Sequence, residues 1–236
     1  MKKKLAPLAL LALCNLHADD SSFKFEGVLG NVVENIQNLN CNAQAFLPYN
    51  PIIVEIGAFE GTGTFGLSCS YPYGTIFAFE PHPTAYDHLV EKTHSFKNVS
   101  VVHSAVSTWN GTAMLYGNEP TASLLPQYGA SPIDVPVVVL DDWCREHGID
   151  HIDFLRLDAG GLEWLIVESS PHILKEVIVI VTKTYMNPSH SWIPPYPLLK
   201  KRLENEGFEL LSHWYQEGNE GEATFVRKYM YDSIFR

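Results

Sequence analysis

Two short stretches, one rich in glycine and one with an acidic residue, lie at a spacing that suits an adenosine cofactor. The first, Gly57-Ala58-Phe59-Glu60-Gly61-Thr62-Gly63, follows the apolar, β-branched run 52–56. The second, Glu80-Pro81, follows the apolar run 75–79 and lies about 20 residues beyond the first glycine. Glycine lets backbone approach a ligand closely, and a carboxylate can accept hydrogen bonds from both ribose hydroxyls. We predict that the cofactor is bound by Gly57, Ala58, Gly61, Glu80 and Pro81, with Glu80 on the ribose.

The glycine spacing favours S-adenosylmethionine (SAM) over a dinucleotide. A dinucleotide turn has the pattern Gly-x-Gly-x-x-Gly, with a helix N-terminus directed at the pyrophosphate. Here Ala58-Phe59 occupies the place of the close second glycine, and Glu55 and Glu60 flank the turn. Acidic neighbours disfavour a pyrophosphate and suit a cationic sulfonium, so Glu55 is included among the predicted cofactor-binding residues. The alternative is an ordinary strand–helix turn without a ligand, and the position of Glu80 argues against it.

The elements around these motifs predict a doubly wound α/β domain. Buried strands are expected at 52–56, 75–79, 99–102, 135–140, 152–157 and 177–181, and helices at 62–70, from Pro83, and at 142–147, 163–169 and 198–206. Thr62 and Asp141 are candidate helix caps. Residues 112–116 alternate like an edge strand, and an antiparallel pair at 208–214 and 223–229 is expected to close the sheet.

Other candidate site residues follow the carboxyl ends of strands, where ligands of such sheets bind. Ser104 and Ala105 are predicted to border the adenine. If a methyl group of SAM is transferred to a hydroxyl, that hydroxyl must lose its proton. The candidates for removing this proton are Asp158 first and then His103 and His190. Asp158 as a turn cap or cofactor contact is an equal alternative, and His103 also fits a plain strand end.

A proline- and aromatic-rich segment, 186–197, is predicted to wall the substrate site. The predicted substrate-binding residues are Tyr185, Trp192 and Tyr196, because aromatic faces suit the apolar faces of sugar rings. The alternative is that Trp192 and Tyr196 fill the core beneath this loop.

Charge and cysteine content restrict the function classes. The 236 residues include 16 Lys and Arg against 27 Asp and Glu, a net charge of −11, with no basic run beyond the N-terminus. Nucleic-acid binding is therefore not expected. The aromatic segment 186–197 suits a small-molecule acceptor, with a carbohydrate as one candidate. Cys41, Cys69 and Cys144 follow no zinc or disulfide spacing, so we expect buried thiols and no metal site. Oligomeric state is not indicated.

The N-terminus resembles a secretory signal. Lys2-Lys3-Lys4 precedes an apolar run, 5–13, and Leu16-His17-Ala18 offers a cleavage site, so residues 1–18 are predicted to be a signal peptide. The mature chain would be exported to the periplasm or outside, without stable membrane insertion, because the run is too short to span. A lipid anchor at Cys14, or an unused signal that leaves the protein in the cytoplasm, are the alternatives. Residues 19–50, with an amphipathic helix at 25–39, would form an extension before the domain at 51–236.

Five stretches in this order resemble the FkbM-type SAM-dependent methyltransferases, over residues 50–185. They are Val54-Glu55-Ile56-Gly57-Ala58; Phe77-Ala78-Phe79-Glu80-Pro81-His82-Pro83; Ser104-Ala105-Val106-Ser107; Val139-Leu140-Asp141-Asp142-Trp143 with Glu146-His147-Gly148-Ile149; and Ile152-Asp153-Phe154-Leu155-Arg156-Leu157-Asp158. The resemblance implies the class I methyltransferase (Rossmann-like) fold, a seven-stranded, mainly parallel sheet with an antiparallel last strand. It implies methyl transfer from SAM to a hydroxyl of a sugar or other small molecule.

The chain departs from that family near the expected site. At the positions of Glu55, Phe59 and Gly160, the family usually has Asp, Asn and Glu, respectively. It usually has an acid at the position of Thr182-Lys183. Two acids on the substrate side are thus missing, so three functions stay open: an active O-methyltransferase, a SAM- or nucleoside-binding protein without catalysis, and a secreted binding module that keeps the fold. Export conflicts with the enzyme reading, since SAM is a cytosolic cofactor.

Overall fold

The structure is a computed structural model that describes residues 43–117, 121–126, 132–188, 193–215 and 219–235. The predicted signal peptide, the predicted helix at 25–39, Cys41, His190 and Trp192 lie outside the described residues. No helix among the described residues is long and apolar enough to cross a membrane.

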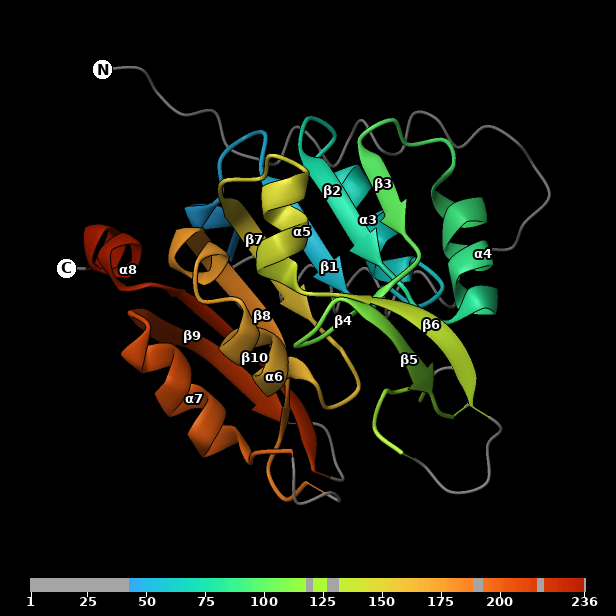
Figure 1. Ribbon diagram of the computed structural model, residues 1–236. Helices are drawn as coiled ribbons and strands as arrows, with labels where there is room; N and C mark the ends of the chain where they lie inside the picture. The colour runs from blue at the N-terminus through green and yellow to red at the C-terminus, as the bar shows by residue number, and fades with distance from the viewer. Residues whose placement is uncertain (1–42, 118–120, 127–131, 189–192, 216–218, 236) are drawn as a thin grey trace.

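A seven-stranded sheet forms the centre of the domain (Figure 1), in the order β3-β2-β1-β7-β8-β10-β9. Its strands are β1 (Ile52–Ile56), β2 (Thr75–Phe79), β3 (Val99–Val102), β7 (Ile152–Leu157), β8 (Val177–Tyr185), β9 (Phe208–Tyr215) and β10 (Glu220–Arg227). The first five strands in this order are parallel, and β10 runs antiparallel to both β8 and β9. The predicted fold class, a mainly parallel sheet with an antiparallel last strand, is confirmed.

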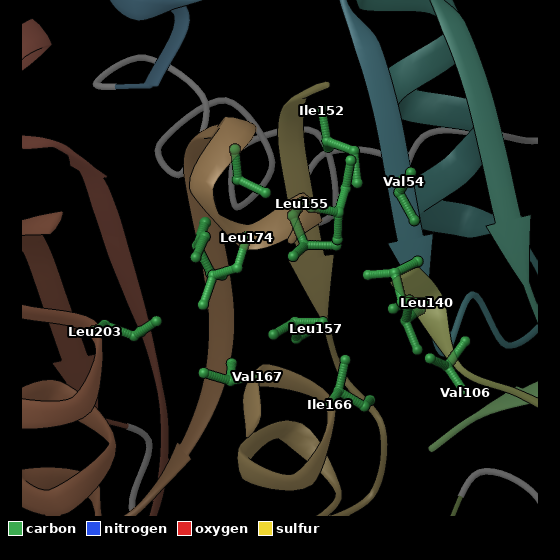
Figure 2. Packing of buried hydrophobic residues seen from close by; sticks show 14 of the residues in the cluster. Val54, Val106, Leu140, Ile152, Leu155, Leu157, Ile166, Val167, Leu174 and Leu203 are labelled. Atoms are coloured by element: carbon green, nitrogen blue, oxygen red, sulfur yellow. The ribbon is translucent and has the colours of Figure 1, made fainter. Parts of the chain in front are cut away.

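Helices cover both faces of this sheet, because its central strands are apolar on both sides. The helices are α3 (Thr62–Ser70), α4 (Pro83–Thr93), α5 (Leu140–Glu146), α6 (Glu163–Ser169), α7 (Tyr196–Asn205) and α8 (Lys228–Phe235), with 3-10 turns η2 (Gln44–Phe46) and η3 (Ile173–Glu176). Val54 of β1 and Leu155 of β7 are paired in register and face the core beneath α5 and α6 (Figure 2). Their neighbours Ile53 and Phe154 face the opposite side, where Leu67 of α3 packs.

A second, three-stranded sheet is inserted between β3 and α5. It contains β4 (Ala105–Val106), β5 (Gly111–Leu115) and β6 (Ile133–Val138) in the order β4-β6-β5. Figure 1 shows it beside the arrowhead ends of β1 to β3. The alternating run at 112–116 predicted one of these strands, but the sequence analysis did not predict a separate sheet.

Several predicted boundaries and caps differ from the structure. Gly61, not Thr62, precedes α3, and no side chain caps that helix. Asp141 lies inside α5, where its carboxylate accepts the backbone N–H groups of His172 and Ile173 at 2.9 and 2.8 Å. It therefore ties α5 to the turn before β8 and does not cap its own helix.

The C-terminal half shows further differences. β8 continues past residue 181 to Tyr185, so Lys183 belongs to a strand. The predicted strand at 223–229 ends at Arg227, and an unpredicted helix, α8, follows. The Arg227 guanidinium fixes the chain where β10 ends. It donates hydrogen bonds to the Val177 carbonyl at 2.7 Å and to the Glu206 carbonyl at 2.6 Å.

Candidate functional site

A cavity of about 530 Å³ lies at the carboxyl ends of the parallel strands. Its walls come from the segments after β1, β2, β3 and β7, from the end of β8, and from residues 121–125 of the inserted region. Seven predicted site residues line it: Gly57, Glu80, Pro81, Ser104, Ala105, Asp158 and Tyr185. The doubly wound topology therefore brings together residues that lie up to about 130 positions apart in the sequence.

The turn after β1 depends on a glycine that lets two strand ends meet. Gly57 has φ of +82°, and a Cβ placed on it would lie 1.9 Å from the Asp158 carbonyl oxygen. The Gly57 and Ala58 N–H groups both donate to the Phe79 carbonyl at 3.0 Å. Gly57 thus lets the ends of β1 and β7 approach each other, and this approach sets Asp158 against the turn.

Glu80 lies in the cavity wall with its carboxylate held by backbone. Its Oε2 accepts the Phe59 N–H at 2.7 Å and its Oε1 accepts the His82 N–H at 2.8 Å. Two backbone donors therefore fix the orientation of this carboxylate in the cavity wall. The geometry fits the predicted ribose contact.

Phe59 has a part in this arrangement that sequence analysis missed. Its φ is +52°, a conformation that non-glycine residues rarely adopt and that costs on the order of 1 kcal/mol or more. Asn, the residue that the family resemblance predicts here, adopts this conformation more readily. Here the turn is kept with Phe59, and its N–H is directed at Glu80.

Glu55 lies beneath the turn and does not line the cavity. Its side chain is 1% exposed, forms an ion pair with Arg156 at 2.7 Å, and accepts a hydrogen bond from the Thr64 hydroxyl at 2.5 Å. Burial raises the pKa of Glu55, and Arg156 and Thr64 oppose that shift. A Cβ on Gly63 would lie 2.3 Å from an Arg156 nitrogen, so this glycine makes room for the ion pair. Glu55 therefore supports the turn from below.

Two other predicted cofactor residues also have packing roles. A Cβ on Gly61 would lie 2.5 Å from Leu89, so Gly61 lets α3 and α4 pack closely. Ala58 is buried in a small cluster with Ala78 and Leu89. Neither is among the residues that line the cavity.

Charged side chains gather at the end of the cavity beside Asp158. The Lys183 ammonium lies 3.6 Å from an Asp158 oxygen and 3.0 Å from a Glu220 oxygen. Burial lowers the pKa of Lys183, but the Asp158 and Glu220 carboxylates outweigh that effect, so its pKa lies above the ordinary value. The Tyr185 hydroxyl also has a raised pKa, from burial and then from the charges of Glu163, Asp158 and Glu220. Lys183 therefore stays a cation and Tyr185 stays protonated.

The turn after Asp158 is held from inside the protein by Glu163. One Glu163 oxygen accepts the N–H groups of Ala159 and Gly161 at 2.8 and 3.3 Å. Burial raises the pKa of this carboxyl group to about 7. Glu163 thus shapes the cavity rim without lining the cavity.

The inserted region packs on the same turn through Gly160. The Ser123 hydroxyl donates to the Gly160 carbonyl at 2.8 Å and accepts the Leu125 N–H at 3.1 Å. A Cβ on Gly160 would lie 3.1 Å from the Ala122 carbonyl oxygen, and φ at Gly160 is +61°. Any side chain here would press on the Ala122 carbonyl of the 121–125 segment, and glycine avoids that contact.

The remaining predicted residues lie elsewhere. The exposed His103 ring stacks on Tyr86 at 4.3 Å and does not line the cavity. Tyr196 is 6% exposed and stacks on His213 at 3.8 Å within the core. The structure thus supports the packing alternative for Tyr196. Among the residues that the structure describes, no group of three or more His, Cys, Asp or Glu side chains is placed to hold a metal ion.

Sequence analysis also missed Lys183, Glu220 and Ser123 as residues of the cavity. Lys183 could have been anticipated from a longer β8, because residues two apart on a strand share a face. Glu220 lies on β10, and only the antiparallel pairing of β10 with β8 brings it to the cavity. Ser123 lies in an irregular segment and carries no such signal.

Comparison with known proteins identifies the relatives of this chain. The FkbM methyltransferase domain matches residues 55–230. Methyltransferase sdnD of Sordaria araneosa is 27% identical over 213 residues, which cover 72% of this chain and 78% of that protein. The 2-O-methyltransferase NoeI of Sinorhizobium fredii is 24% identical over 153 residues, which cover 57% of this chain and 63% of NoeI.

Solved structures of low sequence identity share the fold. Magnesium protoporphyrin IX methyltransferase (ChlM) from Synechocystis, solved with bound SAM, has a TM-score of 0.51 at 9% identity, covering 96% of this chain and all of that chain. An O-methyltransferase family protein from Burkholderia thailandensis has a TM-score of 0.50 at 13% identity, covering 85% of this chain and 56% of that chain. The fold is that of the class I SAM methyltransferases. From the match over residues 55–230, the chain belongs to the FkbM family of SAM-dependent methyltransferases.

Proposed function

We propose that this protein transfers the methyl group of SAM to a hydroxyl of a small molecule, with a sugar hydroxyl as the first candidate. The observation that carries the proposal is the shared cavity. Its lining includes Glu80 and the Gly57 turn, here called the cofactor side, and Asp158, Lys183 and Tyr185, here called the acceptor side. The printed name of NoeI, a 2-O-methyltransferase, supports oxygen as the acceptor atom.

The residues of the cofactor side fit SAM. Glu80 presents a carboxylate that can accept ribose hydroxyls, and Pro81, Ser104 and Ala105 line the adjoining wall, where the adenine is expected. Gly57 has no side chain to cover the backbone of the turn where it lines the cavity. Bound SAM supplies an electrophilic methyl group on a sulfonium.

The residues of the acceptor side bind the acceptor and remove its proton. A hydroxyl must lose its proton as its oxygen is methylated. Asp158 contributes a carboxylate to the cavity lining, and its backbone carbonyl lies against the glycine turn. Tyr185 can donate a hydrogen bond to the acceptor, because its raised pKa keeps the hydroxyl protonated. Most of the remaining catalysis is positioning and exclusion of water. His103 is disfavoured as the base because its ring lies outside the cavity lining.

Two measurements on the full-length protein test the proposal. Calorimetric titration with SAM and S-adenosylhomocysteine tests cofactor binding, and transfer of labelled methyl to a panel of methyl glycosides and polyols tests the acceptor. We expect binding of both ligands and label in an ether product. Asp158→Asn should abolish transfer while SAM still binds.

Matched controls and alternative outcomes complete the design. Asp87 is an exposed carboxylate on α4 that does not line the cavity, so Asp87→Asn should transfer methyl groups at the wild-type rate. Binding of SAM without transfer to any acceptor would favour a SAM-binding protein without catalysis. Failure to bind SAM would favour a binding module. Transfer that survives in Asp158→Asn would assign proton removal to another group or to water.

A further inference from the structure

Lys183 brings a positive charge to the cavity. Its side chain is 28% exposed and lines the cavity. Residue 183 lies on β8 opposite Glu222 of β10, and Tyr185, two residues on, lies opposite Glu220. The antiparallel neighbour β10 therefore supplies Glu220, the acid that pairs with Lys183.

The ammonium is fixed by two carboxylates from different elements. It lies 3.0 Å from Glu220, a hydrogen-bond distance, and 3.6 Å from Asp158, a distance that suits an ion pair without a hydrogen bond. Because Asp158 is against the Gly57 turn, Lys183 stands at the junction of the cofactor side and the acceptor side. The Lys183 nitrogen also lies 5.8 Å from the centre of the Tyr185 ring.

The surroundings of Lys183 are otherwise acidic. Among the described residues that line the cavity, Lys183 is the one lysine or arginine, whereas Glu80, Asp158 and Glu220 are carboxylates. Glu163 lies directly beneath the rim. Without Lys183, these carboxylates would favour any cation that entered the cavity.

A methyltransferase gains nothing from strong stabilisation of the sulfonium charge of its cofactor, because that charge disappears as the methyl group leaves. We propose that Lys183 offsets the charge of Asp158 and Glu220, and so prevents the cavity from binding the cationic cofactor far more tightly than its neutral thioether product. This inference rests on the proposed function, since it assigns to Lys183 a role toward the same cofactor. Lys183 acts as a fixed charge and exchanges no proton.

Binding measurements test this role without an acceptor. The ligands are SAM; sinefungin, a stable analogue with an ammonium group in place of the sulfonium methyl; and S-adenosylhomocysteine. The quantity compared is the ratio of the dissociation constant for S-adenosylhomocysteine to that for each cationic ligand, at low ionic strength. A unit charge several Å from the sulfonium in a partly buried site is worth about tenfold or more in such a ratio.

Lys183→Met and Lys183→Gln should both raise the ratio about tenfold in favour of SAM and sinefungin, and Lys183→Arg should keep the wild-type ratio. Glu220→Gln should change the ratio in the opposite direction. Lys175, an exposed lysine just before the other end of β8, provides the control, and Lys175→Met should leave the ratio unchanged.

The outcomes separate this inference from the proposed function. If the wild-type protein binds none of the three ligands, the proposed function and this inference both fail. If it binds them, but the ratio in folded Lys183→Met and Lys183→Gln stays within twofold of the wild-type ratio, the role of Lys183 is refuted and cofactor binding stands. Circular dichroism of each variant establishes that it is folded.

Discussion

Gly57→Ala tests the closest backbone contact at the cofactor turn. A Cβ at this position would lie 1.9 Å from the Asp158 carbonyl oxygen, whereas real Cβ contacts essentially never fall below 3.0 Å. The ends of β1 and β7 would therefore have to separate by at least about 1 Å. Such overpacking costs about 1–3 kcal/mol, and alanine at a left-handed φ costs about 1–2 kcal/mol more. We expect a loss of roughly 2–5 kcal/mol in the free energy of unfolding.

Gly148→Ala isolates the backbone part of that loss. Gly148 has φ of +67°, and nothing lies within 4 Å of a Cβ placed there. Urea denaturation of both variants gives the two free energies at comparable m-values. Gly57→Ala should lose at least about 1 kcal/mol more than Gly148→Ala, because only position 57 adds the steric term. Equal losses would refute the close approach of Asp158 to the turn, and with it the geometric basis for placing Asp158 in the site.

Four other measurements test further parts of the protein. Glu80→Gln should weaken SAM binding by about 1–3 kcal/mol by calorimetry, and unchanged affinity in a folded variant would contradict the ribose assignment. Arg156→Met should cost about 3–5 kcal/mol of unfolding free energy, because it leaves a buried carboxylate unpaired; adding Glu55→Gln should restore most of it, and no recovery would argue against the pair. Burial raises the pKa of Glu163 from 4.5 to about 7, so its ionisation is delayed in the folded state, and stability should fall as pH rises from about 4.5 to 7 and then level off. That decrease, on the order of 3 kcal/mol, should be absent in Glu163→Gln, which keeps the acceptor oxygen. Mass spectrometry of native protein should find a mature N-terminus at Asp19 if the predicted signal is cleaved, and an intact Met1 would contradict export.

The strands that carry the cofactor motifs could be predicted closely, because their signals are local. A β-branched run followed by a glycine predicts β1 and its turn, and the same logic gives β2 with Glu80. Both strands have the predicted bounds in the structure, 52–56 and 75–79. Asp158 was also predicted at a strand end, and the parallel topology then places it beside the turn.

The charged end of the cavity was harder to predict because its contacts are not local. Lys183 meets Glu220 only because β10 returns antiparallel to β8, and no periodicity in either strand indicates that pairing. Aromatic character alone could not decide the role of Tyr196, since a tyrosine can serve equally as core or as substrate wall. The burial of Glu55 also follows from tertiary structure: its partner Arg156 lies 101 residues away.

That separation has a consequence for how the chain folds. β1 has β2 on one side, close in sequence, and β7 on the other, after an interval of about a hundred residues that includes the inserted sheet. Closing so long a loop costs entropy before any contact repays it, and folds with many such pairings are slow. During synthesis β1 and β2 can pair early, with one edge of β1 still open to mispairing. The Gly57 turn reaches its final shape only when β7 arrives, so the ability to bind a ligand should appear among the last steps of folding.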